Sequence, residues 1–212
     1  ARSVAPGFMA EYDAAVLAST ADPVDEVTET SKAVGFLRSE HANCSAILWD
    51  NLERNPDKLA VVGPAGSLTY AQLVASAAQW GNAFLRFGLR RGDRIPFFLD
   101  DTPAYPAAFF GAVRAGLVPV LLNTQTNAET LAYFLADTEA RLVLCEADLR
   151  GAFPDDIVAA SGVEKIVIVN GGAEASGQIS DEEFLQGMPT DLDCADTSAG
   201  DTVSYTHLRA HE

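Results

Sequence analysis

The chain has 212 residues, of which 48% are hydrophobic and 21% are charged, and this balance is typical of a folded globular protein rather than a disordered one. Its formal net charge of -16 argues against nucleic acid as a partner, because phosphate backbones are bound by Lys and Arg. The three cysteines are scattered without a C-x-x-C spacing and no apolar run reaches the roughly 18 residues of a membrane span, so we expect no disulfide framework, no metal site, no transmembrane helix and a cytoplasmic location.

The first 42 residues differ in pattern from those that follow. Ala, Ser, Thr and Asp dominate residues 1–42 and no apolar period is sustained, so we expect an irregular arm there. Residues 43–55 have the pattern of a helix, with Ile47, Leu48 and Leu52 on one side. Pro56 ends this helix, because proline cannot continue it.

A hairpin and a long amphipathic helix are predicted next. Leu59–Val62 and Ser67–Tyr70 are short strands separated by the turn sequence G-P-A-G. Thr69 and Gln72 form a T-x-x-Q capping box, which satisfies two backbone N–H groups at the start of a helix. Apolar side chains recur along this helix at the 3.6-residue spacing of one buried stripe: Leu73, Ala77, Trp80, Phe84 and Phe87. Gly88 is the expected end, because glycine tolerates a left-handed backbone.

Four further segments are predicted as strands because they are apolar at nearly every position. They are Ile95–Leu99, Val118–Leu122, Leu142–Cys145 and Lys165–Val169. Strands that are apolar on both faces are covered by helices on both sides, which is the arrangement of a parallel sheet. Pro119 conflicts with the second of these strands, because proline cannot donate to a ladder, and we expect it at a strand start or a bulge.

Helices are predicted between these strands. Thr102 and Pro103 open the first of them, with proline in the first turn, where its missing N–H costs nothing. Its buried side is supplied by Phe109, Phe110 and Val113. Thr126 and Glu129 form a second capping box that opens the next helix, and a third helix lies near Asp155–Ala160.

This alternation of strands and helices with short links predicts the fold class. We expect an α/β fold with a doubly wound, mostly parallel sheet and flanking helices over residues 43–202. Residues 146–202 carry 13 acidic and two basic residues, a bias that we interpret as a solvated surface. Within this stretch, residues 170–202 are predicted as a polar link that holds one short helix around Asp181–Gln186.

The final residues, 203–212, differ in composition from the preceding chain and hold two of its three histidines. They hold His207 and His211 at the four-residue spacing of two helical metal ligands, but no third ligand accompanies them. The string is similar to translated sequencing-adapter read-through. We therefore interpret it as a non-native tail without a functional role.

Complete catalytic motifs do not occur in the sequence. G-x-G-x-x-G, the G-x-x-x-x-G-K-[ST] phosphate loop and G-x-S-x-G are all absent, and His41 has no paired nucleophile. Asp100 and Asp101 follow a predicted strand, where ligands of α/β proteins often bind. A second interpretation is that these acids complement the positive end of the following helix.

Three stretches together resemble the adenylate-forming acyl-CoA synthetases of the AMP-binding superfamily. Ser67–Leu73 (S-L-T-Y-A-Q-L) is similar to the strand-turn-helix motif near the start of their domains. Phe109–Asn123 (F-F-G-A-V-R-A-G-L-V-P-V-L-L-N) is similar to the next shared motif, and Ala132–Leu144 (A-Y-F-L-A-D-T-E-A-R-L-V-L) to the helix and strand that follow. The phrasing L-D-D-T-P-A-Y-P-A-A-F-F-G-A-V together with V-L-L-N-T is most similar to benzoate-CoA ligases and related aromatic acid synthetases.

This resemblance implies that residues 43–202 are the incomplete N-terminal subdomain of an adenylate-forming domain. In that family a carboxylate attacks the α-phosphate of ATP to give an acyl-adenylate and pyrophosphate, and a thiol, usually of coenzyme A, then displaces AMP. The implied partners of a full-length parent are ATP, Mg2+, coenzyme A and a carboxylic acid, here an aromatic, benzoate-like one. Two other members of the family, a fatty-acyl-CoA synthetase and a carrier-protein-loading adenylation domain, are alternatives, and a non-catalytic α/β binding module is a third.

The resemblance also implies where catalytic residues belong. The family's phosphate loop, [ST]-S-G-[ST]-T-G-x-P-K-G, is expected soon after Asp201 and Thr202, and this sequence does not contain it. We therefore expect no catalytic residue, no bound cofactor and no ligase activity in this chain alone. In some relatives the loop after V-L-L-N carries an Arg near the coenzyme A entrance. Thr124 and Gln125 occupy that loop here and are the candidates for cofactor contact.

Overall fold

The computed structural model describes residues 43–198 and 200–204 of the chain. The predicted arm over residues 1–42, and His207 and His211 of the tail, lie outside this described part. Within it, no helix combines the length and the apolar character that crossing a bilayer requires.

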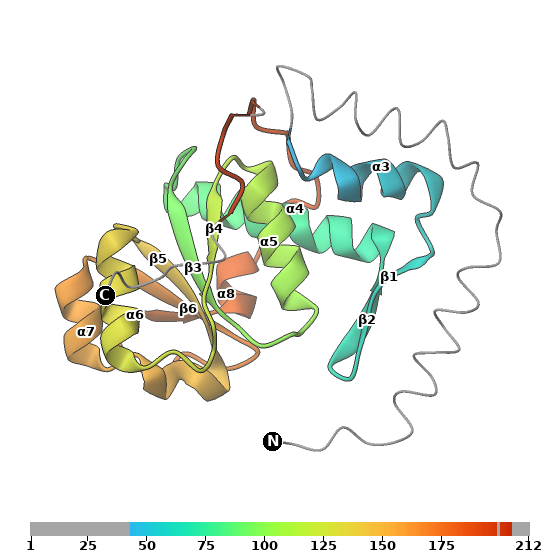
Figure 1. The fold of residues 1–212 in the computed structure, drawn as a ribbon. Coiled ribbons are helices and arrows are strands. Elements are labelled where there is room, and N and C mark those ends of the chain that lie inside the picture. The colour runs from blue at the N-terminus through green and yellow to red at the C-terminus, as the bar shows by residue number, and fades with distance from the viewer. Residues whose placement is uncertain (1–42, 199, 205–212) are drawn as a thin grey trace.

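A five-stranded parallel sheet in the order β4-β3-β5-β6-β7 forms the centre of the fold. Its strands are β3 (Arg94–Phe98), β4 (Val118–Leu121), β5 (Leu142–Glu146), β6 (Lys165–Val169) and β7 (Gln178–Ser180). Helices lie on both sides of the sheet (Figure 1), so that every residue of β5 is buried. The predicted doubly wound α/β fold is confirmed.

Two hydrophobic cores lie on the two faces of the sheet. One is formed with α3 (Ala46–Arg54), α4 (Tyr70–Phe87), α5 (Ala104–Arg114) and α8 (Asp181–Leu185), and the other with α6 (Ala128–Asp137), the 3-10 helix η1 (Ala147–Ala152) and α7 (Asp155–Ser161). Successive strand residues face opposite cores, as Phe97 and Phe98 of β3 do. This alternation explains why the strands are apolar at nearly every position.

Pro119 lies in β4, an edge strand, and not at a bulge or at the strand's first residue. The backbone N–H of Val118 donates to the carbonyl of Asp93, just before β3, at 2.9 Å, and that of Leu122 donates to the carbonyl of Phe97 in β3 at 3.0 Å. Because N–H directions alternate along a strand, the nitrogen of Pro119 faces away from β3. The missing donor therefore interrupts no ladder bond, and the edge position resolves the conflict that the sequence raised.

The hairpin and α4 follow the sequence closely. Strands β1 (Leu59–Gly63) and β2 (Gly66–Thr69) pair antiparallel outside the main sheet (Figure 1). The Thr69 hydroxyl accepts from the Gln72 N–H at 3.3 Å while the Gln72 side chain accepts from the Thr69 N–H at 2.9 Å, which is the predicted capping box. Gly88 ends α4 with φ 96°. The predicted stripe is buried, except that Phe87 is half-buried at the end of the helix.

Helix α5 packs against α4 more closely than its sequence suggests. A Cβ atom on Gly111 would lie 2.3 Å from the Ala77 carbonyl oxygen, and one on Gly81 would lie 2.7 Å from the Gly111 oxygen. Only small side chains fit such a contact, so the fully buried residues of α5 include Ala107, Ala108 and Ala112. The prediction that Phe109 and Phe110 form the buried side was wrong, because both are half-buried at the margin of this contact.

Two details of other helices also differ from the prediction. Helix α6 is capped by Asn127, whose side chain accepts from the Thr130 N–H at 2.9 Å, and not by Thr126. The cap is shifted by one residue because the preceding turn uses Asn123, whose carbonyl accepts from the Thr126 N–H at 2.9 Å. In α3, Leu48 is buried but Ile47 is 61% exposed, so the helix presents a narrower apolar face than expected.

Residues 170–202 hold more structure than the one predicted helix. They contribute the short parallel strand β7 before α8. Residues 184–195, which begin in the last turn of α8, then lie along α4 and α5. The side chains of Asn82 and Arg86 donate to backbone carbonyls of this segment, at 2.8 Å to Asp191 and 2.6 Å to Phe184. Leu192 is buried against Gly81. The description of this stretch as a polar link was therefore incomplete.

Candidate functional site

The carboxyl ends of the strands carry a group of polar side chains that are hydrogen-bonded to one another. In open α/β sheets this edge is where ligands bind. The turn after β3 supplies Asp100 and Thr102, β5 ends in Glu146, and the turn after β6 begins with Asn170, next to Asp181 at the start of α8. We refer to these five residues as the carboxyl-edge cluster.

Hydrogen bonds join the members of this cluster. The Asn170 Nδ2 group donates to Glu146 Oε1 at 2.7 Å and to the Thr102 hydroxyl at 3.2 Å. The other oxygen of Glu146 accepts from the backbone N–H of Asp100 at 3.4 Å, and the Asn170 backbone N–H donates to Asp181 Oδ2 at 3.2 Å. One carboxylate therefore connects the ends of three strands.

Glu146 is a buried acid with no basic partner in this cluster. Its side chain is among the few buried polar groups of the described chain, at 6% exposure. Burial raises the pKa of Glu146, the hydrogen bonds from Asn170 and Asp100 oppose this, and the negative charges of Asp100 and Asp181 raise it further. The same edge affects Tyr105, whose pKa is raised by burial and by Asp101.

The predicted contact residues Thr124 and Gln125 lie at the same edge, in the turn that follows β4. Asn123 shapes this turn, because its side-chain oxygen accepts from the Gln125 N–H at 2.9 Å. Gln125 is exposed and Thr124 is half-buried. Both are neutral, so the turn offers hydrogen-bonding groups but no positive charge to an anionic cofactor.

Glu146 and Asn170 were not singled out from the sequence. Two local signals mark them: an acid that ends an otherwise apolar strand, L-V-L-C-E, and an Asn-Gly pair directly after the strand K-I-V-I-V. Asn170 has a left-handed φ of 58°, which asparagine tolerates better than most residues. Neither signal says that the two side chains meet, because 24 residues separate them.

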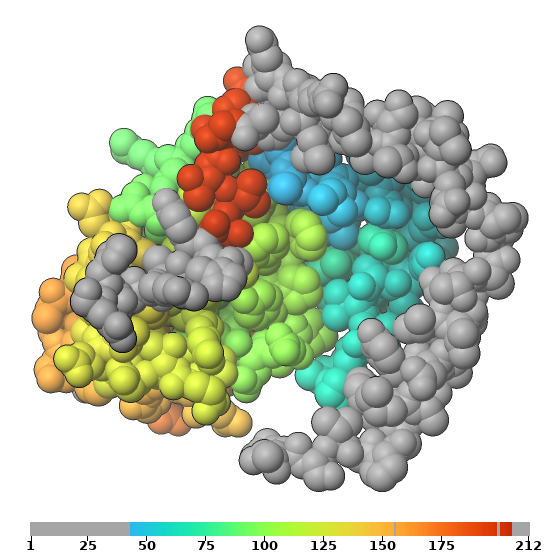
Figure 2. All heavy atoms as spheres, in the orientation of Figure 1, coloured from blue at the N-terminus to red at the C-terminus, as the bar shows by residue number. Residues whose placement is uncertain are grey.

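The opposite, amino edge of the sheet holds a cavity of about 430 Å³. Arg91, Arg94, Gly92, Val118, Asp137 and Asp201 are among the residues that line it. Arg91 pairs with Asp201, and residues near the end of the described chain lie against the start of α3 and the turn before β3 (Figure 2). We refer to this cavity as the amino-edge pocket.

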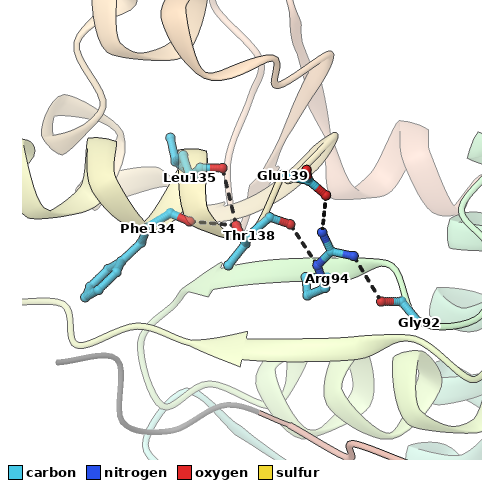
Figure 3. A network of polar contacts seen from close by, with 6 residues as sticks. All are labelled: Gly92, Arg94, Phe134, Leu135, Thr138 and Glu139. Carbon is cyan, nitrogen blue, oxygen red and sulfur yellow. Dashed lines mark hydrogen bonds and ion pairs between the residues drawn. The ribbon is translucent and has the colours of Figure 1, made fainter. Parts of the chain in front are cut away.

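Arg94 is occupied by structural contacts (Figure 3). Its Nε donates to the Thr138 carbonyl at 2.8 Å, and its Nη2 contacts Glu139 Oε2 at 2.8 Å. Thr138 is itself held by the Phe134 carbonyl, which accepts from its hydroxyl at 2.7 Å. This arginine therefore ties the start of β3 to the end of α6.

Other candidate chemistry is weak in the described part of the chain. Across residues 43–198 and 200–204, no three His, Cys, Asp or Glu side chains are placed to hold a metal ion together. Cys145 is buried in β5, and burial raises its pKa to about 12, which makes it an unreactive thiol at neutral pH. Cys145 packs in the core on one face of the sheet as a small hydrophobic residue.

The sequence of the chain matches a known protein family. Residues 48–206 match the model of the AMP-binding enzyme family. The chain is 40% identical over 112 residues to a 4-hydroxybenzoate--CoA/benzoate--CoA ligase of Rhodopseudomonas palustris, covering 53% of this chain and 21% of that protein. It is 31% identical over 149 residues to a 3-hydroxybenzoate--CoA ligase of Aromatoleum sp. (strain CIB), covering 70% and 28%.

Solved structures show the same likeness. The anthranilate CoA ligase AuaEII in complex with anthranoyl-AMP superposes with a TM-score of 0.75 and 27% identity, over 78% of this chain and 32% of that one. A benzoate CoA ligase from Burkholderia xenovorans LB400 superposes with a TM-score of 0.67 and 26% identity, over 76% and 32%. The chain therefore spans about a third or less of the length of these relatives.

Proposed function

Because the chain belongs to the AMP-binding enzyme family, we propose that it forms the N-terminal part of an ATP-dependent acid–thiol ligase, which activates an aromatic, benzoate-like carboxylic acid and transfers it to coenzyme A. The observation that carries this proposal is the likeness to ligases of benzoate, hydroxybenzoates and anthranilate, both in sequence and in backbone. These acids share a carboxyl group on an aromatic ring. The predicted cytoplasmic location belongs to the same proposal.

The residues described here do not fit the phosphates of ATP. Cradles for phosphate are built from backbone N–H groups and basic side chains, and charge accumulates on the phosphates as the reaction proceeds. The carboxyl-edge cluster instead presents acids around Glu146, and Arg94 at the other edge is held by Thr138 and Glu139. We therefore assign no step of the reaction to these side chains.

The role that we propose for this chain is structural support for the ligase. Its sheet and helices form a layered platform, and Asp201 is held at the amino edge by Arg91. From the resemblance to this family, we expect the phosphate loop of the longer protein soon after Asp201. Alone, the 212 residues should give no acid-dependent exchange of pyrophosphate into ATP, because this sequence has no phosphate loop.

The test is an assay of the longer protein that contains these residues. With ATP, Mg2+ and coenzyme A, we expect pyrophosphate release and AMP formation that depend on benzoate, a hydroxybenzoate or 2-aminobenzoate. Reactions without acid and without coenzyme A are the controls. The 212-residue chain, assayed in parallel, should stay at the level of the no-acid control.

The same assay separates the alternatives. Two further relatives are reasons to assay two other classes of acid. The long-chain fatty acid transport protein 1 of Rattus norvegicus is 30% identical over 102 residues, and the phosphinothricin tripeptide synthetase PhsC is 32% identical over 155 residues. Activity with long-chain fatty acids alone would replace the aromatic substrate. Activity with amino acids, retained without coenzyme A, would indicate a carrier-protein-loading domain. Inactivity with every acid would favour a non-catalytic module.

A further inference from the structure

The last turn of α5 is bound by two segments that are distant in sequence. The Val113 carbonyl accepts from the Asn43 side chain at 2.9 Å, and the Arg114 carbonyl accepts from the Ala195 N–H at 2.8 Å. Because the last carbonyls of a helix lack a partner within it, they are open to such donors. The end of α5 therefore holds residues near both ends of the described chain.

The side chain of Arg114 adds two contacts at the same point. Its Nε donates to the Leu192 carbonyl at 2.8 Å, and its Cζ atom lies 4.1 Å from the centroid of the Trp49 ring in α3. A planar guanidinium group can stack on an aromatic ring and donate from its edge at the same time, which an ammonium group cannot do. Arg114 thus joins α3, α5 and residues 192–195 through both its side chain and its backbone.

Residues 192–195 are also held by packing. Leu192 is buried against Gly81 of α4. A Cβ atom on Gly116 would lie 2.9 Å from the Cβ of Ala195, so the segment passes directly over the end of α5. Contacts as close as these allow little displacement of the backbone while the Arg114 hydrogen bonds are in place.

A second tie follows six residues later, at Asp201. Its carboxylate accepts from the Ser198 N–H at 2.8 Å and pairs with Arg91. The side chains of Arg91 and Asp201 are 53% and 38% exposed, and exposed ion pairs contribute little to stability. The contacts of Arg114 are therefore the stronger constraint on the chain that leads to Asp201.

We propose that Arg114 is a positioning residue for acyl-adenylate formation: by fixing residues 192–195, it sets where the chain enters the phosphate loop. This role rests on the proposed function, since the loop is expected soon after Asp201 only from the family resemblance. Such a loop steadies the phosphates of ATP while the carboxylate attacks the α-phosphorus and pyrophosphate leaves. Transfer to coenzyme A comes after pyrophosphate has left, so a displaced loop slows the first step and spares the second.

The two steps can be assayed separately in the longer protein. Acid-dependent exchange of pyrophosphate into ATP reports the first step. Thioester formation from coenzyme A and the added acyl-AMP of the preferred acid reports the second. Arg114→Met keeps the length of the stem and removes the charge and the donors. We expect its exchange rate to fall about tenfold or more and its rate of thioester formation to stay within about twofold of the wild type.

Three results would overturn this role: an equal loss in both steps, a loss in the second step alone, or no loss in either. A wild-type longer protein that is inactive in both steps would instead overturn the proposed function, on which the role rests. If Arg114→Met does not fold, Arg114→Lys takes its place. Lysine keeps the charge and a donor but not the planar stack on Trp49, so the same selective loss should appear to a smaller extent.

Arg86→Met is the matched control. Arg86 also donates to backbone carbonyls of residues 184–195, those of Phe184 and Gln186, but at the beginning of this segment, far along the chain from Asp201. This variant should lower stability without separating the two steps. A selective loss as large as that of Arg114→Met would show that Arg114 has no particular role.

Amide hydrogen exchange of the 212-residue chain gives a readout that needs no activity. The reporter is the Ala195 N–H, which donates to the Arg114 carbonyl, and the reference is the Ile166 N–H, which donates to the Gly177 carbonyl. In Arg114→Met, we expect Ala195 to lose protection about tenfold or more relative to Ile166. Unchanged protection would show that the Arg114 side chain does not fix this segment, and would overturn the positioning role.

Discussion

The two edges of the sheet are held together by opposite chemistry. At the amino edge, Arg94 and Arg141 donate to the backbone carbonyls of Thr138 and Gly88 and also pair with acids. At the carboxyl edge, Glu146 is held by neutral donors and faces further acids. The first arrangement joins charges of opposite sign, whereas the second buries one charge without its opposite.

This difference teaches what each edge is suited to do. A guanidinium group offers five donors and stays charged at every physiological pH, so its ties to carbonyl oxygens are constant. Desolvation raises the pKa of a buried carboxyl group, so the group changes charge at a higher pH than an exposed one. The hydrogen bonds that it accepts therefore depend on pH. We therefore expect the contacts at the amino edge to be independent of pH in the physiological range and those at the carboxyl edge to change with pH.

The largest loss of stability is expected from a substitution in the core between the two edges, and it sets the scale for the substitutions at the edges. Trp80 is 1% exposed in α4, so Trp80→Asp would bury an unpaired charge and cost several kcal/mol, of the order of 4 kcal/mol or more. Urea unfolding monitored by circular dichroism measures this, and Tyr133→Asp, at an exposed position of α6, is the matched control. An unfolding midpoint equal to that of the wild type would show that the stripe of α4 is not core.

A smaller loss is expected from the amino edge alone. Arg94→Ala removes the donor to the Thr138 carbonyl and leaves that carbonyl at the end of α6 without this partner, which costs about 1–2 kcal/mol. Arg141→Ala should have a smaller effect, because both the Arg141–Glu164 pair and the Arg141 hydrogen bond to the Gly88 carbonyl are exposed, so that water can replace them. Equal losses in the two variants would mean that exposure does not decide the strength of these ties.

The smallest effects are the pH slopes, and they should have opposite signs at the two edges. The Arg141 guanidinium lowers the pKa of Glu164 below its ordinary value of 4.5, so this acid adds stability above that pH and loses it as pH falls through the lowered pKa. The raised pKa of Glu146 works the other way, since its ionisation removes stability as pH rises above its ordinary value of 4.5.

Urea midpoints of Glu164→Gln and Glu146→Gln, measured across the acid and neutral range, test these signs. Relative to the wild type, Glu164→Gln should be less stable near neutral pH and equal to it in strong acid. Glu146→Gln should gain stability relative to the wild type as pH rises. Parallel curves for the two variants would remove the contrast between the edges.

Local patterns predicted the parts of the fold that depend on neighbours in sequence. The capping box of Thr69 and Gln72, the turn between β1 and β2, and the left-handed Gly88 each involve groups a few residues apart. Burial of the strands on both faces was equally readable, because each strand is apolar at nearly every position. Thr124 and Gln125 came from the family resemblance, and their contact with a cofactor stays a prediction, as do the domain limits at residues 42 and 202.

The sequence by itself determined the order and type of most elements of this protein, because hydrophobic period and capping are properties of short segments. Only the tertiary structure decided which face of α5 is buried, since that depends on how closely Gly81 and Gly111 let two helices approach. It also decided that β7 and residues 184–195 pack on the core. Glu146 and Asn170 meet for the same reason: β5 and β6 are neighbours in a parallel sheet, and parallel pairing brings the ends of separate strands together at one edge.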